Sequence, residues 1–362
     1  MAIFSLLCFG IASSMKQKIV SDSFEQKLAA ARLMAAAMDS LKQDRLRQGY
    51  VIDVENDPNE TGLVGAQFSL ITTDEGDLDA KLTTLDPNFA TALVELYSRL
   101  YLGPGDTIAV LMTGSMPGGN MAALIAAKIM GITPVAIASV GASQWGANQP
   151  DFTWLDMEQK LYHWGFIPSV SIAASIGGRN DQGRLLSPRG RKIIVNTIQK
   201  YGLPLIRHTS LEDNIRERLN RFQDVLPLEK YSAVVNVGGG VASLGTNLNP
   251  KLIPPGIVRR PQFQSISRPD GIPGVLYHFA EKNVPVIHIL NIRGLTEKLK
   301  MPFAPIPLPE IGTGQIYAET KYDLVATMVA WVLVVGMVFG VGYRSHKQIR
   351  QRMEQHEPDS VL

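Results

Sequence analysis

The sequence carries residues suited to chemistry in three loops, and each loop follows an apolar run of the kind that forms a buried strand. The first loop runs from Thr113 to Asn120 and contains Gly114 and Ser115 ahead of a helical segment. Glycine lets the main chain approach a ligand closely, and a helix N-terminus offers free N–H groups to an anion. We therefore expect a phosphate or carboxylate site here, although a tight turn with a capping serine would give the same pattern.

Ser115 could also act as a nucleophile, which makes it the candidate catalytic residue. The G-x-S-x-G spacing of a nucleophile elbow is missing around it, so hydrolase chemistry is the minority interpretation. The loop is not a Walker-type phosphate loop either, because no Gly-Lys-Ser/Thr follows. This argues against an ATP-dependent ligase.

The second loop runs from Ser139 to Glu158 and mixes small polar residues with two tryptophans. Loops of this length in compact domains are often functional. Its candidate ligand-binding residues are Ser143, Trp145, Asn148, Asp151 and Asp156. Asp156 and Glu158 are two residues apart and do not share a helix face, so no carboxylate dyad is expected. Helix capping by Asp151 or Thr153 is the structural alternative.

The third loop contains Gly238, Gly239 and Gly240 directly after an apolar run. Successive glycines can form an anion-binding nest of main-chain N–H groups. The spacing departs from G-x-G-x-x-G, so a dinucleotide site is weakly supported, and close packing of the main chain would explain the glycines equally well.

Basic residues cluster in two acid-poor stretches, 179–207 and 251–268. They predict a face that follows a polyanion, although an ordinary solvated surface gives the same pattern. Its candidate residues are Arg189, Arg191, Arg259 and Arg260. The net charge of +2 and the lack of a recognisable motif argue against nucleic-acid binding. Cys8 is the only cysteine and the histidines show no ligand spacing, so we expect no metal and no cofactor.

These loops require a scaffold of alternating strands and helices. Expected strands are 107–112, 133–139, 169–174, 204–207, 233–237 and 284–290. Expected helices are 86–102, 120–130, 155–164, a segment opening at Pro188, 210–225, 274–282 and 293–300. Continuous apolar strands that alternate with helices predict an α/β domain over 51–300, with a mostly parallel sheet in three layers. An N-terminal helix within 19–50 should precede it, with an apolar side that needs either the domain or another protein as partner.

Both ends of the chain are apolar. Residues 322–343 span about 30 Å as a helix and predict a transmembrane segment. The basic tail 344–362 places the C-terminus in the cytoplasm and the large domain outside. The proline-rich stretch 301–320 should be an extended spacer. Segment 1–18 is too short to span, so we interpret it as part of a signal anchor whose start lies upstream.

Four ordered motifs together resemble a bacterial family, the poly-gamma-glutamate system proteins. They are DPNETGLVG (57–65), TGSMPGGNMAALIAAK (113–128), SVGASQWGANQPDFTWLDME (139–158) and NVGGGVASLG (236–245). The likeness covers most of the chain, and the third motif is long and specific. Members of that family are associated with the synthase and membrane proteins that make or export poly-γ-glutamate, so the resemblance implies these partners. It implies no catalytic residue.

Three hypotheses follow for this chain. The leading one is a membrane-anchored accessory component that binds poly-γ-glutamate through the strand-end anion sites and the basic face. The second is an amide hydrolase or transferase with Ser115 as nucleophile. The third is a structural anchor for partner membrane proteins, contacted through the N-terminal helix.

Overall fold

The computed structural model describes residues 2–355 and divides into two units. The large unit is Asp22–Tyr317, and the smaller one is formed by the residues up to Ser21 together with those from Ala318. The helices are α1 Ala2–Ser14, α2 Phe24–Arg47, α3 Leu78–Thr84, α4 Phe89–Arg99, α5 Pro117–Ile129, α6 Trp154–His163, α7 Pro188–Lys200, α8 Leu211–Val225, α9 Val241–Leu244, α10 Arg260–Ile266, α11 Val275–Glu281, α12 Ile292–Leu299 and α13 Leu324–Gln355.

The strands of the large unit form a mixed seven-stranded sheet in the order β7-β6-β3-β2-β8-β10-β9. Their bounds are β2 Thr107–Thr113, β3 Thr133–Ser139, β6 Ala173–Ser175, β7 Leu205–Ile206, β8 Ala233–Val237, β9 Gly256–Val258 and β10 Val286–Ile289. Only β9 runs antiparallel to its neighbour. Two short strands, β4 Asn148–Gln149 and β5 Phe152–Thr153, pair separately. The predicted α/β fold with a mostly parallel sheet is confirmed.

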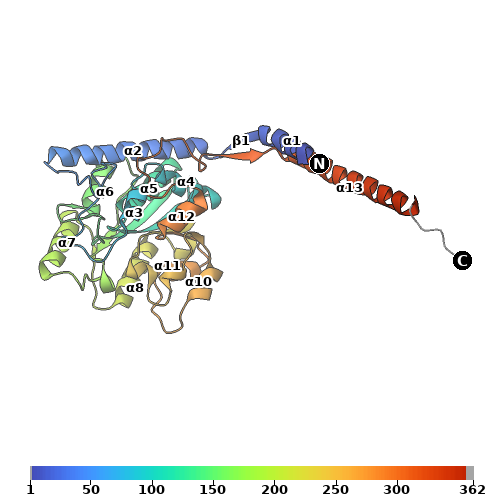
Figure 1. Cartoon of the computed structure of the whole chain (residues 1–362). Coiled ribbons are helices and arrows are strands. Elements are labelled where there is room, and N and C mark those ends of the chain that lie inside the picture. The colour runs from blue at the N-terminus through green and yellow to red at the C-terminus, as the bar shows by residue number, and fades with distance from the viewer. Residues whose placement is uncertain (1, 356–362) are drawn as a thin grey trace. The chain divides into compact units, whose positions relative to one another are not determined.

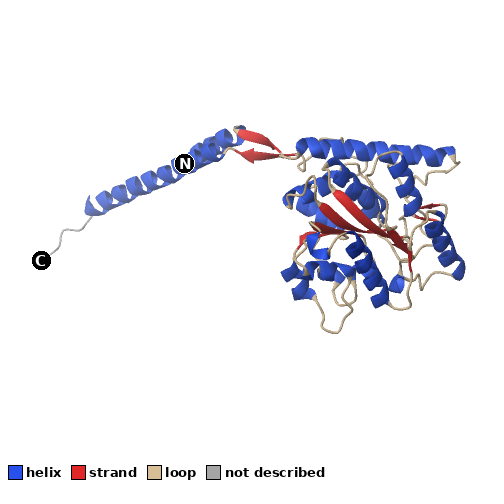
Figure 2. Ribbon diagram, turned by 180° about the vertical axis from the view of Figure 1, so that it is seen from behind, coloured by secondary structure: helices blue, strands red, loops and turns tan. Residues whose placement is uncertain are grey.

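Helices cover both faces of the sheet, which gives the three layers expected from the sequence (Figures 1 and 2). Along β2, Val110 and Met112 face one core and Ala109 and Leu111 face the other. The first core contains α2, α4, α5, α6, α7 and α12, and the second contains α8, α10 and α11. Side chains alternate because successive residues of a strand point to opposite faces.

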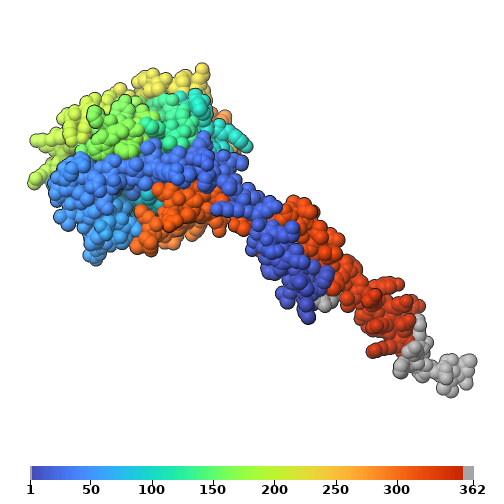
Figure 3. All heavy atoms as spheres, turned by 90° about the horizontal axis from the view of Figure 1, so that it is seen from above, coloured from blue at the N-terminus to red at the C-terminus, as the bar shows by residue number. Residues whose placement is uncertain are grey.

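Helix α2 packs on the large unit along its apolar side, where Ala30, Met34 and Leu41 are fully buried. Near its start, Lys27 Nζ lies 2.6 Å from Glu95 Oε2 of α4 and 2.7 Å from the main-chain oxygen of Ile316. The domain itself is therefore the partner that the apolar side of this helix required. Figure 3 shows α2, in blue, running across the surface of the large unit beside its orange C-terminal segment.

The proline-rich stretch differs from the spacer predicted over 301–320. Residues 301–317 belong to the large unit and pack against it. Asn88 Nδ2 donates to the main-chain oxygen of Pro309 at 3.1 Å, and the Tyr317 hydroxyl donates to Asn88 Oδ1 at 2.7 Å. Prolines exclude helix and strand but leave the carbonyl oxygens free to accept such bonds.

Other elements also depart from the sequence expectation in detail. Helix α5 begins at Pro117 rather than at 120, because proline suits the first helical position. None of the expected helices covers α3, and none of the expected elements covers β9 or α10, which lie in the basic stretch 251–268. Strand β6 is shorter than the predicted 169–174 and shifted towards the C-terminus.

The smaller unit joins the two ends of the chain. Strand β1 (Lys16–Val20) pairs antiparallel with β11 (Ala318–Tyr322), with Lys16 opposite Tyr322. Helix α1 packs against α13. By length and composition, α13 is the one helix among the described residues that could cross a membrane, and α1 is apolar but shorter. The basic tail continues the same helix to Gln355, and its remaining residues lie outside the described part of the chain.

Candidate functional site

The strand order reverses between β2 and β8, which are neighbours in the sheet but not in the chain. From β2 the chain adds β3, β6 and β7 on one side, then returns to place β8 and β10 on the other. Open α/β sheets bind ligands at such a switch point, outside the carboxyl ends of the strands. A cleft of about 420 Å³ lies there, bounded by the loops after β2, β3, β6, β8 and β10 and by residues 73–81.

The switch point is closed by contact between β2 and the glycine loop after β8. The Thr113 hydroxyl donates to the main-chain oxygen of Val237 at 3.2 Å. Gly238 has φ +91°, and a Cβ there would stand 2.1 Å from Thr113 Oγ1. Asn236 Nδ2 donates to the main-chain oxygen of Gly238 at 2.8 Å and fixes the turn. Only glycine fits this position, both for its dihedral angle and for its contact.

The loops after β2 and β3 lock together behind the cleft. A Cβ on Gly114 would lie 2.4 Å from the main-chain oxygen of Val140, so the two main chains touch. The N–H of Ala147 donates to the Gly114 oxygen at 2.7 Å. In front of this contact, the N–H of Ser143 donates to Ser115 Oγ at 2.9 Å. The Ser115 side chain therefore fixes the main chain that carries Ser143.

Lys81 of α3 extends towards Ser115 and Ser143 and is only 3 % exposed. Its Nζ lies 3.0 Å from Ser143 Oγ and donates to the main-chain oxygen of Ser115. Burial lowers the pKa of Lys81 to about 8, against an opposing effect of the Asp77 carboxylate. Desolvation penalises the charged form of a lysine, and this site supplies only neutral oxygen partners at short range.

Helix α3 is held in place from three directions. Asp77 caps it by accepting the N–H of Ala80 at 3.2 Å. Gly118 of α5 lies so close that a Cβ there would stand 2.2 Å from the main-chain oxygen of Thr84. The N–H of Ala304 donates to Thr83 Oγ1 at 2.8 Å. The proline-rich segment and α5 thus both fix the helix that carries Lys81.

The mouth of the cleft carries charges of both signs. Asp74, Glu75 and Asp77 are exposed at one side, and Arg179 is exposed on the loop after β6. The floor carries hydroxyl groups and Lys81. A cleft with both signs of charge suits a ligand that also carries both, rather than a run of like charges.

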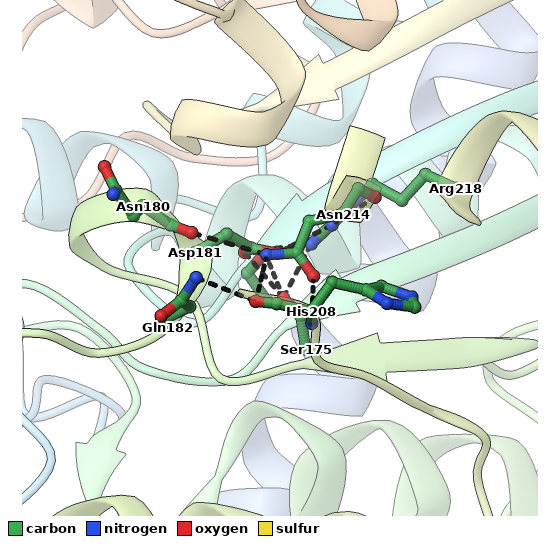
Figure 4. A network of polar contacts seen from close by, with 8 residues as sticks. Ser175, Asn180, Asp181, Gln182, His208, Asn214 and Arg218 are labelled. Carbon is green, nitrogen blue, oxygen red and sulfur yellow. Dashed lines mark hydrogen bonds and ion pairs between the residues drawn. The ribbon is translucent and has the colours of Figure 1, made fainter. Parts of the chain in front are cut away.

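The loop after β6 is anchored by a buried ion pair, which Figure 4 shows within its network of polar contacts. Arg218 of α8 contacts both carboxylate oxygens of Asp181, at 2.7 Å and 2.9 Å. Ser175 Oγ donates to Asp181 Oδ1 at 2.7 Å and accepts from Arg218 at 2.6 Å. Asn180 and Asp181 both have positive φ, 54° and 61°, a conformation that non-glycine residues hold only with support.

A second layer of hydrogen bonds ties this loop to the segment after β7 (Figure 4). Gln182 Nε2 donates to the main-chain oxygen of His208 at 2.7 Å. The N–H of His208 donates to Asn214 Oδ1 at 2.9 Å. The loop that presents Arg179 to the cleft is therefore fixed from its base.

The structure brings together about half of the residues predicted from the sequence. Thr113, Ser115, Ser143 and the three glycines Gly238, Gly239 and Gly240 all line the cleft. Gly114 lies behind it, packed on Val140. Asn120 is fully buried in α5 and donates to the main-chain oxygen of Thr113 at 2.9 Å, so it supports the cleft from within the core.

The other predicted residues of the second loop do not line the cleft. Asn148 is fully buried and bonds to both main-chain groups of Ala66, at 2.7 and 2.9 Å. Trp145 is half-buried with φ +56°, and Asp151 is exposed. Of the described residues, those lining the cleft include none of these three.

Helix capping, the structural alternative left open for Asp151 or Thr153, holds for Thr153, and Asp156 takes part in the same cap. The two residues form a capping box at the start of α6, and Lys200 Nζ lies 2.8 Å from Asp156 Oδ1. Burial acts to raise the pKa of Asp156, but hydrogen bonds from Lys200, Tyr201 and Thr153 outweigh it and lower the pKa.

The four arginines of the predicted polyanion face do not gather on one surface. Arg189 and Arg191 belong to α7, which packs beside β7 at one edge of the sheet. Arg259 and Arg260 follow β9 at the opposite edge (Figure 1). Arg260 also pairs with Glu281 at 3.1 Å.

The sequence analysis missed Lys81, Arg179 and Asp181. Lys81 stood out only as the single basic residue within the acidic stretch 51–86. That contrast in charge was the only sequence signal for Lys81. Asp181 is likewise the one acid in the basic stretch 179–207. No cluster of His, Cys, Asp or Glu that could hold a metal occurs among the described residues.

The buried ion pair can be tested by removing one charge. Asp181→Asn should lower the free energy of unfolding by about 3–5 kcal/mol, because Arg218 would remain buried without its counter-charge. The double variant Asp181→Asn/Arg218→Met should recover much of that loss, because it removes both charges and asparagine tolerates the positive φ of this position. Glu217→Gln removes a more exposed pair on the same helix and should change stability by less than about 1 kcal/mol. Denaturant unfolding measures all three, and equal losses for Asp181→Asn and Glu217→Gln would contradict the assignment.

The pKa of Lys81 predicts how stability changes in alkali. Its folded pKa of about 8 lies below the ordinary value of 10.5, so between these pH values the unfolded chain binds more protons. Stability should therefore rise from pH 8 towards pH 10.5, by about 3 kcal/mol from this residue. The rise is measured as the difference between the wild type and Lys81→Met, since the tyrosines that titrate in this window are common to both. Parallel curves for the two proteins would refute the depressed pKa.

Comparison with known proteins gives little further guidance. No protein-family model matches the chain, and no curated protein matches it. Among solved structures it is similar to one described as the crystal structure of O-ureido-L-serine synthase, at 15 % sequence identity over 59 % of this chain and 64 % of that chain, with a TM-score of 0.16. The aligned part is less than two thirds of that protein, and a likeness at this score carries no argument. The functional conclusion depends on the residues of the cleft.

Proposed function

We propose that this protein is a membrane-anchored accessory component of poly-γ-glutamate synthesis or export, and that its cleft binds the end of a γ-linked glutamate chain. The proposal is supported by the four motifs that resemble the poly-gamma-glutamate system proteins, by the apolar helix α13 and by the charges of the cleft. The observation that carries it is the presence of charges of both signs at the mouth of one cleft.

A run of carboxylates fits this cleft poorly, because Asp74, Glu75 and Asp77 would repel it at the mouth. The amino-terminal residue of a γ-linked glutamate chain has a different pattern of charge. It carries an ammonium and a carboxylate on one carbon, with its γ-carboxyl group in the amide bond to the next residue. The acids at the mouth match the ammonium, and Arg179 matches the carboxylate.

The wide separation of the four arginines supports the same interpretation. A polymer bound along its length needs a continuous basic track, whereas Arg189 and Arg259 lie near opposite edges of the sheet. Binding of a chain end needs only the cleft. A terminus held there leaves the rest of the polymer free for the synthase and export proteins that we propose as partners.

The membrane orientation is part of the proposal. Four basic residues follow the apolar span, Arg344, Lys347, Arg350 and Arg352, and such an excess marks the cytoplasmic side. The large unit would then lie on the extracytoplasmic side of the cell membrane, where exported polymer emerges.

Protease accessibility tests the orientation. In intact spheroplasts, added protease should degrade the large unit and spare a tag at the C-terminus, because the tag would be shielded by the membrane. Detergent should expose both to cleavage and serves as the control. Protection of the large unit together with loss of the tag would reverse the assignment.

Binding of a synthetic γ-linked glutamate pentamer to the full-length protein in detergent tests the ligand. Arg179→Ala should weaken binding by about 10- to 150-fold if one charge-assisted hydrogen bond is lost. Acetylation of the pentamer's terminal amine should weaken it too, because it removes the ammonium. Arg189→Glu and Arg259→Glu are the matched surface controls and should bind normally. Unchanged binding of the acetylated pentamer, with weakened binding by the two surface variants, would instead support a polyanion track.

A further inference from the structure

We propose that Ser143 and Lys81 form a nucleophile–base pair that breaks the γ-amide bond of the bound chain end and passes the acyl group to water or to an amine. This assigns a chemical activity to the same cleft and rests on the proposed function for its substrate. It also moves the nucleophile from Ser115, the sequence candidate, to Ser143.

The first support is geometric. Lys81 Nζ lies 3.0 Å from Ser143 Oγ, within the hydrogen-bond reach that a general base needs. Both residues line the cleft, and Ser143 is 8 % exposed, so its oxygen is screened from bulk water but faces the cavity. A neutral lysine has two N–H groups and one lone pair. One N–H serves the main-chain oxygen of Ser115, and the lone pair is then available to accept the Ser143 proton.

The second support is electrostatic. Burial lowers the pKa of Lys81 to about 8, so about a tenth of the lysine is neutral at pH 7 and the neutral share rises as the pH approaches 8. Asp77 on the same helix opposes this effect, and Asp74, Glu75 and Arg179 line the same cleft. Asp181 lines it as well but is neutralised by Arg218.

Ser115 has a different role in this arrangement. Its hydroxyl oxygen accepts the N–H of Ser143 at 2.9 Å, while Lys81 contacts only its main-chain oxygen. Ser115 is therefore a positioning residue that holds the main chain of Ser143 against the lysine. The glycines behind it permit that approach, because a Cβ on Gly146 would stand 2.9 Å from the Cα of Ser115.

The reaction balances with water as the co-reactant. Ser143 Oγ bonds to the γ-carbonyl carbon while its proton passes to Lys81 Nζ. The carbon–nitrogen bond then breaks, and the leaving amine takes the proton from the Lys81 ammonium. An ester of Ser143 remains. Water then attacks this ester while Lys81 Nζ accepts one of its protons. The bond between the acyl carbon and Ser143 Oγ breaks, and the Lys81 ammonium returns the proton to Ser143 Oγ, which releases the carboxylic acid and restores the serine. An amine in place of water gives a new amide.

The experiment has a covalent arm and a substrate arm, both with the full-length protein in detergent. A fluorophosphonate probe should form a phosphorus–oxygen bond to Ser143 with loss of fluoride, located by mass spectrometry of peptides. Labelling should speed up as pH rises through about 8 and should slow at least about 100-fold in Lys81→Met. Lys282→Met and Ser265→Ala are controls at exposed positions away from the cleft and should label normally. Ser115→Ala should slow labelling, and Ser115→Thr, which keeps the hydroxyl, should restore it with the same pH profile.

In the substrate arm, the γ-linked glutamate pentamer should release glutamate with the wild type and not with Ser143→Ala. Labelling at Ser115 instead of Ser143, or binding of the pentamer with neither labelling nor cleavage, would overturn the pair while leaving the proposed function intact. Labelling of Ser143 that depends on Lys81, with a pentamer that neither binds nor reacts, would keep the pair and overturn the proposed function.

Discussion

The close approach of three glycines to neighbouring segments is the constraint on which the cleft depends. Gly238, Gly114 and Gly118 each stand where a Cβ would meet another atom at 2.1–2.4 Å. A side chain at any of them would separate the loops after β8 and β3, or α3, from their neighbours. Because interiors are packed to crystal-like density, such a separation cannot be absorbed locally. Gly114 and Gly238, which the sequence predicted as ligand-binding residues, therefore act first by letting neighbouring segments approach closely. The cleft is the space that remains between these segments.

Burial of Lys81 in this cleft costs free energy of folding. A lysine ammonium loses its hydration when it is buried, and two neutral oxygens replace only part of it. The chain does not add a carboxylate against Nζ, as it does for Arg218 with Asp181. The two buried cations around the cleft, Arg218 and Lys81, therefore differ in their partners. Arg218 is neutralised and rigidifies a loop, whereas Lys81 keeps a destabilised proton, which is the property expected of a group with a chemical role.

The sequence predicted the sheet well because its strands are continuous apolar runs, and runs such as 107–112 and 233–237 need no long-range information. It predicted the cleft in part, because Ser115, Ser143 and Gly239 all follow strands, and parallel strands bring their carboxyl ends to one edge. The predicted polyanion face was wrong, because residues in neighbouring stretches of the chain need not lie close together in the sheet. The arginines of α7 and those after β9 look like one basic region, but the reversal of strand order sends them to opposite edges. Lys81 was missed because its helix has seven residues and is held by tertiary contacts, which no local pattern records.

The pairing of β1 with β11 has a consequence for how the protein is made. The two strands lie roughly 300 residues apart in the chain, yet each is the partner strand of the other in a two-stranded sheet. At about 5–20 residues per second, a ribosome needs roughly 15–60 s to deliver the second strand after the first. The whole sheet of the large unit can form in that interval, so the ribbon closes last. The large unit is then joined to the ribbon by two covalent connections instead of one, and a single peptide-bond break in either of them would not release it.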